Sequence, residues 1–202
     1  MLRVGVIGCG TIGGEICQAI DNGLVEADLV GIHDVVVPNA DRLAQRLRKT
    51  PPVLSQVQLI EAADLVVEAT AAAVAPGIIR AALGGARDIM VMSVGGLLAC
   101  LDEALTLAQN QNRRIYVPTG AIAALDAVKG AAVATVSRVT LTTRKPPQAL
   151  AGAPFVVKNR INLEGLEQPL RLFAGTAREG AALFPSNVNV AAALGLAGIG
   201  AE

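Results

Sequence analysis

Aromatic residues are almost absent from this 202-residue chain: it has no Trp, one Tyr and three Phe. Single-strand nucleic-acid binders stack bases on aromatic side chains, so the scarcity argues against that class. Seventeen Lys and Arg balance seventeen Asp and Glu. The formal net charge of zero offers no general attraction to nucleic acid or to an anionic membrane. With 52% hydrophobic residues, the chain is expected to fold around an aliphatic core.

Cysteine and histidine are also scarce. The chain has three cysteines, Cys9, Cys17 and Cys100. Their odd number and the absence of CxxC spacing argue against a disulfide framework and against a metal site. His33 is the only His. The N-terminal apolar stretch is interrupted by glycines, and the uncharged stretch 180–201 by Pro and Asn, so neither an export signal nor a membrane span is predicted. These features indicate a cytoplasmic protein.

Short β-branched runs alternate with Ala-rich helical windows through the first 118 residues, which is typical of parallel strands joined by crossover helices. Strands are expected at 2–7, 28–34, 64–68, 88–92 and 114–117, and helices at 13–20, 38–49, 75–83 and 101–110, with a turn at 93–96. A domain boundary is placed near Pro118. In the smaller second domain, 119–202, the alternating stretch Val133 to Thr143 predicts a half-exposed strand of an α/β or α+β fold, and 190–196 a helix.

The sequence Gly8-Cys9-Gly10-Thr11-Ile12-Gly13 fits the G-x-G-x-x-G fingerprint between a predicted strand and helix. Its first glycine permits the tight turn, its second admits a pyrophosphate and its third allows close packing of helix on strand. We therefore expect a Rossmann dinucleotide-binding domain, with Gly8, Gly10, Thr11, Ile12 and Gly13 at the cofactor. A glycine-rich turn that binds nothing is the alternative.

Asp34 lies at the end of the second predicted strand, where a carboxylate can accept hydrogen bonds from the adenosine ribose. Its position favours NAD, while Arg42 and Arg46 on the next helix leave NADP open. Ala69, after the third strand, and Ser93 to Gly96, after the fourth, fall at the ligand-binding edge of such a sheet, although ordinary turns explain them equally well. His33, Cys9 and Cys100 are interpreted as packed residues rather than catalytic groups.

Several segments together resemble the L-aspartate dehydrogenases, NAD(P)-dependent enzymes of NAD biosynthesis. The resemblance is carried by the fingerprint and by the segments 64–69, 117–126, 142–147, 172–179 and 183–191. It implies oxidation of L-aspartate to iminoaspartate, a homodimer, and cofactor contacts from Ala123, Asn187 and Asn189. Without the resemblance, the two Asn residues predict a helix cap. Arg144 or Lys145 is a candidate for binding a substrate carboxylate, against the alternative of a solvated strand end.

The family continues past the position of Glu202 into an Asn-x-His segment whose His is the expected acid/base. The resemblance therefore implies that the catalytic His lies beyond Glu202 and that this chain is C-terminally truncated. Two alternatives stay open. One is a cofactor-binding relative without turnover, and the other is an enzyme of the homoserine dehydrogenase or dihydrodipicolinate reductase type.

Overall fold

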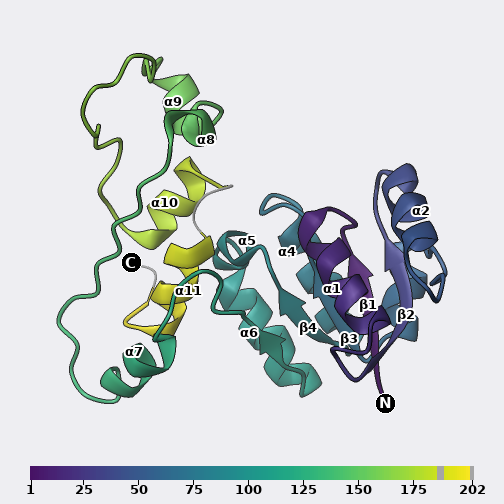
Figure 1. Cartoon of the computed structure of the whole chain (residues 1–202). Helices are drawn as coiled ribbons and strands as arrows, with labels where there is room; N and C mark the ends of the chain where they lie inside the picture. The colour runs from purple at the N-terminus through teal and green to yellow at the C-terminus, as the bar shows by residue number, and fades with distance from the viewer. Residues whose placement is uncertain (186–188, 201–202) are drawn as a thin grey trace. The chain divides into compact units, whose positions relative to one another are not determined.

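A computed structural model describes residues 1–185 and 189–200 (Figure 1). The chain divides into two compact units, Met1–Pro118 and Thr119–Glu202. The first unit contains a five-stranded sheet and the helices that cover it. The second unit is described separately below.

The sheet of the first unit has the strand order β2-β1-β3-β4-β5, and every neighbouring pair is parallel. Its strands are β1 (Leu2–Ile7), β2 (Ala27–His33), β3 (Leu65–Glu68), β4 (Asp88–Val91) and β5 (Ile115–Tyr116). The order reverses between β1 and β3, because β2 lies on one side of β1 and the later strands lie on the other. The expected Rossmann-type α/β fold is confirmed.

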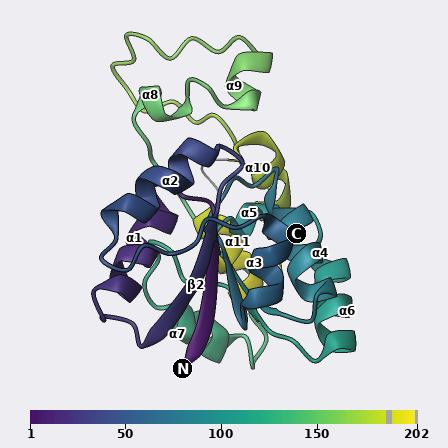
Figure 2. The same cartoon turned by 90° about the vertical axis from the view of Figure 1, so that its right-hand side faces the viewer.

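Helices cover both faces of this sheet (Figure 2). α1 and α2 lie on one face, and α3, α4 and α6 lie on the other. The bounds are α1 (Thr11–Asp21), α2 (Val37–Arg46), α3 (Gln56–Ala62), α4 (Ala75–Gly84), α5 (Val94–Leu98) and α6 (Leu101–Gln111). Burial on both faces explains why the central strands are almost continuously apolar.

The period of two along β1 divides its side chains between the two faces. Val4 and Val6 join the buried cluster that α1 and α2 complete. Gly5 points to the opposite face, where an added Cβ would lie 2.6 Å from Leu59 of α3. The missing side chain at Gly5 therefore lets α3 approach the sheet closely.

Two helices of the first unit differ from the sequence predictions. α3 was not predicted, yet it begins with a capping box in which the Ser55 side chain accepts from the Gln58 backbone. The predicted turn at 93–96 is wrong, because α5 begins at Val94. Glycine disfavours helices, but a Cβ on Gly96 would lie 2.5 Å from the Ala72 carbonyl oxygen. Close tertiary packing thus explains a glycine-containing helix that local propensity does not predict.

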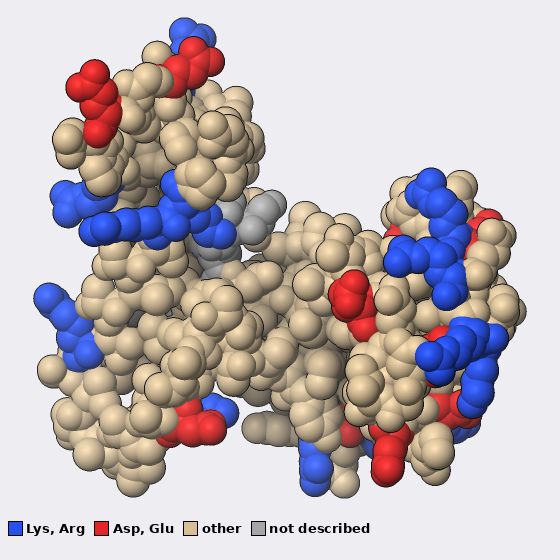
Figure 3. Space-filling model, in the orientation of Figure 1, with Lys and Arg blue, Asp and Glu red and all other residues tan. Residues whose placement is uncertain are grey.

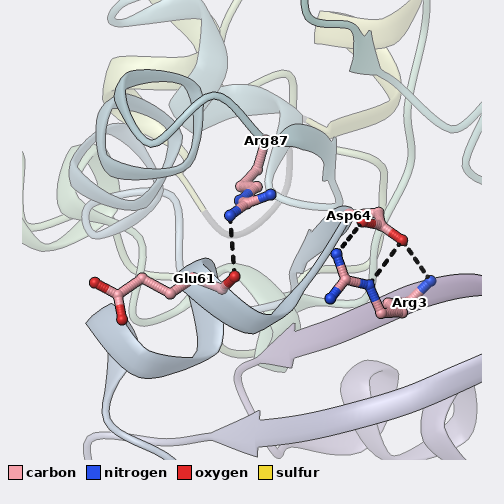
Figure 4. A network of polar contacts seen from close by, with 4 residues as sticks. All are labelled: Arg3, Glu61, Asp64 and Arg87. Carbon is pink, nitrogen blue, oxygen red and sulfur yellow. Dashed lines mark hydrogen bonds and ion pairs between the residues drawn. The ribbon is translucent and has the colours of Figure 1, made fainter.

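An ionic network ties the amino ends of β1 and β3 (Figure 4). Asp64 accepts hydrogen bonds from the Arg3 backbone N–H, Nε and Nη2. The Arg3 guanidinium lowers the pKa of Asp64 to about 2. Nearby, Arg87 donates to the backbone carbonyl oxygen of Glu61 over 3.0 Å. The network lies at the sheet edge opposite to the glycine fingerprint.

In the described part of the second unit, residues 119–185 and 189–200, the regular elements are all helices. They are α7 (Leu125–Ala131), α8 (Pro147–Leu150), α9 (Pro154–Lys158), α10 (Ala177–Leu183) and α11 (Asn189–Ala197). The strand predicted at Val133 to Thr143 is wrong in this structure, since residues 135–146 form neither helix nor strand. Alternation alone does not make a strand. It needs a neighbouring strand to pair its backbone and an apolar surface to cover its face, and Val133 is 92% exposed.

The core of the second unit gathers the three Phe residues of the chain. The ring of Phe184 lies 5.5 Å from that of Phe155 and 5.9 Å from that of Phe173, centroid to centroid. These tilted pairs have the geometry that aromatic quadrupoles favour. They connect α9 to the end of α10. Within the described residues, none of the helices has the length and apolar character that crossing a membrane requires.

Candidate functional site

The carboxyl edge of the parallel sheet gathers the polar and glycine-rich segments that follow its strands. The fingerprint follows β1, Asp34 follows β2, Ala69 follows β3 and Ser93 follows β4. Because parallel strands end at the same edge, these segments are neighbours in space, as predicted. Open α/β sheets bind ligands at this edge, where the strand order reverses.

Two fingerprint glycines are required by the protein's own packing. Gly8 has φ +102°, and an added Cβ would lie 2.4 Å from the Ala69 carbonyl oxygen. A Cβ on Gly13 would lie 1.9 Å from the Gly8 carbonyl oxygen. Gly8 therefore serves both the turn and the contact with the loop after β3, and Gly13 serves helix packing.

Gly10 differs from these two glycines. A Cβ built on Gly10 meets nothing within 4 Å, and its φ of −76° is accessible to any residue. The structure itself thus gives no internal reason for a glycine here. What distinguishes the position is the open space beside it.

α1 begins directly at this open space. Its N-cap is Gly10, so no capping side chain accepts a hydrogen bond from the first-turn N–H groups. Thr11 and Ile12 are exposed, and Gly13 is buried. The positive end of an 11-residue helix therefore faces the carboxyl edge of the sheet.

The Asp34 carboxylate is held against the fingerprint. One carboxylate oxygen accepts the backbone N–H of Cys9 over 2.8 Å, and the other accepts the backbone N–H of Val36 over 2.8 Å. Asp34 is half-buried. These two bonds fix the carboxylate beside the glycine loop and leave each oxygen with a further lone pair for a ligand hydroxyl.

His33, Cys9 and Cys100 are at least partly buried, in line with their interpretation as packed residues, and Cys17 is buried as well. His33 Nδ1 lies 2.8 Å from the Leu54 carbonyl oxygen, which can only accept, so Nδ1 carries the proton. Burial, with a smaller effect of Asp34, raises the pKa of the Cys9 thiol to about 12. Burial likewise raises the pKa of Cys17 to about 12 and also raises that of Cys100. Thiols held in the protonated form are poor nucleophiles.

A pocket of about 390 Å³ lies beside the fingerprint, between α1 and α2. Its lining includes Gly10 and Thr11 from the fingerprint and Arg42 and Arg46 from α2. Arg42 also donates to the Asn39 side chain over 2.6 Å. Basic side chains gather over α2 (Figure 3). The open surface at the glycine loop therefore borders a basic helix.

Glu68 is a residue that the sequence analysis did not single out. It is the last residue of β3, is fully buried, and accepts hydrogen bonds from Thr70 and Ser93. The available signal was an acidic residue closing a strand buried on both faces. A carboxylate is costly to bury unless it is hydrogen-bonded, so such a position implies a specific set of donors.

The candidate residues of the second unit have a plainer setting. Ala123 is exposed in the segment before α7, and Asn189 is the exposed first residue of α11. Asn187 lies outside the described residues. Arg144 and Lys145 are exposed in an irregular segment rather than at the end of a strand. Within the described parts of the chain, His, Cys, Asp and Glu form no group of three able to hold a metal ion.

Comparisons with protein families divide the chain as its structure does. Residues 8–118 match the family model "Homoserine dehydrogenase, NAD binding domain", and residues 126–202 match "Aspartate dehydrogenase, C-terminal". The first match is to a cofactor domain. The second distinguishes between the dehydrogenase types that the sequence analysis left open, because it covers the unit that follows that domain.

Relatives and solved structures also match this chain. The chain is 45% identical over its whole length to the L-aspartate dehydrogenase of Methanocella arvoryzae, covering 76% of that protein, and 44% identical to that of Bradyrhizobium diazoefficiens, covering 71%. A crystal structure of aspartate dehydrogenase from Thermotoga maritima matches 97% of the chain and 73% of that chain, with a TM-score of 0.66 and 20% identity. A Lactobacillus casei myo-inositol dehydrogenase crystallised with NAD(H) and myo-inositol matches 64% of the chain and 40% of that protein, with a TM-score of 0.54 and 18% identity. At these low identities the structural matches establish the fold, whereas the sequence identities establish the family: this chain belongs to the L-aspartate dehydrogenases.

Proposed function

We propose that this protein oxidises L-aspartate with a nicotinamide dinucleotide, giving iminoaspartate, which hydrolyses to oxaloacetate and ammonia. The observation that carries the proposal is the 45% identity to an L-aspartate dehydrogenase across the whole chain. We further propose a cytoplasmic homodimer with NAD as the preferred cofactor and NADP as an accepted one.

The fingerprint fits the diphosphate of such a cofactor. The open space at Gly10 is a cradle that a side chain would fill, and the first turn of α1 presents N–H groups to it. We assign the diphosphate to Gly8, Gly10, Thr11, Ile12 and Gly13. Among the three glycines, only Gly10 has no contact within the protein that requires the side chain to be absent. Contact with a ligand is therefore the best explanation for glycine at this position.

Asp34 is assigned to the adenosine ribose. Its carboxylate is fixed by the Cys9 and Val36 N–H groups, so the acceptors are oriented before a ligand arrives. A carboxylate favours the ribose diol of NAD and repels a 2′-phosphate. Arg42 and Arg46 line the pocket beside the loop and carry positive charges that can bind a 2′-phosphate. Their presence supports acceptance of NADP as well.

The remaining assignments follow the family. Ala69, whose carbonyl approaches Gly8, is placed at the cofactor, and Ala123, Asn187 and Asn189 are proposed to contact the nicotinamide part. An Asn side chain can both donate to and accept from a carboxamide, and so can hold the ring in one orientation.

A bound nicotinamide ring would supply the acceptor for the hydride that leaves the substrate Cα. The chain's part is to hold the cofactor and orient the substrate beside it, which lowers the barrier by reducing the entropy lost on reaching the transition state. Arg144 or Lys145 is proposed to bind a substrate carboxylate. His33 is not assigned as the acid/base, because its Nδ1 proton is donated to Leu54 on the first unit.

The proposal is tested by two measurements. NADH titration followed by fluorescence is expected to show saturable binding to this chain. In a version extended through the family's Asn-x-His segment, L-aspartate with NAD is expected to raise absorbance at 340 nm, whereas L-homoserine and D-aspartate give no increase. Binding without turnover would favour the cofactor-binding alternative, and absence of binding would overturn the proposal.

A further inference from the structure

Glu68 combines full burial with an unusually complete set of hydrogen bonds. Its relative exposure is 0%, and it closes a strand whose other residues, Leu65, Val66 and Val67, are also buried. The carboxylate therefore does not reach solvent. Any influence that it has on a ligand must pass through the groups that it binds.

Those groups belong to the segments that follow two different strands. Oε1 of Glu68 accepts the Thr70 backbone N–H and hydroxyl, each over 2.7 Å, and lies 3.0 Å from the Ser93 hydroxyl. Oε2 accepts the Ser93 backbone N–H over 3.0 Å. Each carboxylate oxygen thus accepts a backbone N–H from a different segment, one after β3 and one after β4.

This tie continues the sheet beyond its last backbone pairing. The ladder between β3 and β4 ends with Glu68 beside Val91, and the Met92 N–H donates to the Glu68 carbonyl oxygen. Past this point the Glu68 side chain replaces backbone pairing. The Ser93 hydroxyl also lies 3.2 Å from the Thr70 carbonyl oxygen, and Gly96 packs against the Ala72 backbone. The two segments are therefore held as one surface.

The surface formed by these two segments lies where the nicotinamide half of a dinucleotide binds in folds of this type. The fingerprint and Asp34 follow β1 and β2, on one side of the reversal in strand order. Segments 69–72 and 93–96 follow β3 and β4, on the other side. A dinucleotide bound across this reversal has its adenosine half at β1 and β2 and its nicotinamide half toward β3 and β4.

We propose that Glu68 is a positioning residue that joins the segments after β3 and β4 into the surface receiving the nicotinamide half of the cofactor. The inference rests on the proposed function. It adds a residue that touches neither cofactor nor substrate, acting through the Thr70 and Ser93 backbone. Binding of the adenosine half, which depends on the fingerprint and Asp34, is expected to be independent of it.

Glu68→Gln is the sharpest change because it keeps the shape of the side chain. A Gln amide has one oxygen and one NH2, so an NH2 group must face either the Thr70 N–H or the Ser93 N–H. Two donors then point at one another, and one of the two segments loses its tie. The two hydroxyls can turn to accept, but the backbone N–H cannot.

The experiment compares two ligands, NADH and ADP-ribose, by calorimetry on the full chain and on Glu68→Gln. ADP-ribose has the diphosphate and adenosine but no nicotinamide. We expect Glu68→Gln to weaken NADH binding about tenfold, the scale of one lost buried hydrogen bond, while ADP-ribose affinity stays within about twofold. Glu103→Gln, the same change at an exposed residue of α6, is the matched control and is expected to alter neither affinity.

If the Glu68→Gln variant does not fold, Ser93→Ala provides a second test of the proposal. It removes one hydroxyl and keeps the backbone bond to Glu68, so a smaller, roughly threefold loss confined to NADH is expected. Equal weakening of NADH and ADP-ribose, or no change in either, would overturn the role of Glu68. A wild-type chain that binds neither ligand would instead overturn the proposed function, so the two failures are distinguishable.

Discussion

The backbone N–H of Cys9 donates to the carboxylate of Asp34 over 2.8 Å, which joins the two parts of the dinucleotide fingerprint that lie 25 residues apart. The glycine loop after β1 and the acidic end of β2 are thus one preassembled structure. Preorganisation of this kind reduces the entropy lost on binding. It also means that substitution of Asp34 affects the loop as well as the ribose site.

Gly10→Ala is expected to weaken NADH binding at least about tenfold while the fold is kept, because the new Cβ enters the proposed diphosphate space and touches no protein atom. NADH fluorescence titration and thermal melting measure the two effects. Gly77→Ala, in α4, is the matched control, since its Cβ also meets nothing within 4 Å. Unchanged NADH affinity in Gly10→Ala would remove the loop from the cofactor site.

Asp34→Ala is expected to reduce affinity for NADH more than for NADPH. The substitution removes the ribose acceptor and also the partner of the Cys9 and Val36 N–H groups, so both affinities fall, but repulsion of the 2′-phosphate disappears as well. Arg42→Ala is expected to reduce affinity for NADPH more than for NADH, because it removes a positive charge that can bind the 2′-phosphate. Both dissociation constants, measured at one salt concentration, give the comparison. Equal losses in Asp34→Ala would contradict the ribose assignment.

The Arg3–Asp64 pair is expected to contribute to stability at neutral pH and to lose that contribution in acid. Asp64 has its pKa lowered from 3.8 to about 2, chiefly by the Arg3 side-chain hydrogen bond. A lowered carboxyl pKa stabilises the fold above the unfolded value and ceases to do so as pH falls from about 4 to about 2. Urea midpoints of the wild type and Asp64→Asn should therefore differ slightly at pH 7 and converge near pH 2. Asp41→Asn serves as the control, and a pH-independent gap for Asp64→Asn would show that the ion pair is not its cause.

The three thiols are expected to react slowly with an aromatic disulfide reagent at pH 8 in the folded chain. The pKa values of Cys9 and Cys17 are raised to about 12, mainly by burial, so little thiolate is present. In guanidinium chloride the 3 thiols of the chain should all react at the rate of a free cysteine. Absorbance of the released chromophore follows both samples. Fast native labelling at Cys9 would show that its environment is more open than the structure describes.

The sequence by itself determined most of the first unit and part of the second. Parallel strands buried on both faces are nearly continuous apolar runs, and a glycine fingerprint needs its strand and helix at fixed spacing. Both features can therefore be recognised from a short stretch of sequence. The strand at Leu2–Ile7 was predicted with the bounds that the structure gives it, and the helices predicted at 13–20 and 190–196 fall within α1 and α11.

Tertiary structure decided the features that depend on contacts between segments far apart in the sequence. Gly96 lies in a helix although glycine disfavours one, and its missing side chain leaves room for the Ala72 backbone, while residues 135–146 are irregular although their alternation suits a strand. Glu68 closes an apolar strand in the sequence, but its four hydrogen bonds come from Thr70 and from Ser93, 25 residues away. A buried carboxylate is stable only where donors converge on it, and that convergence exists only once β3 and β4 lie side by side.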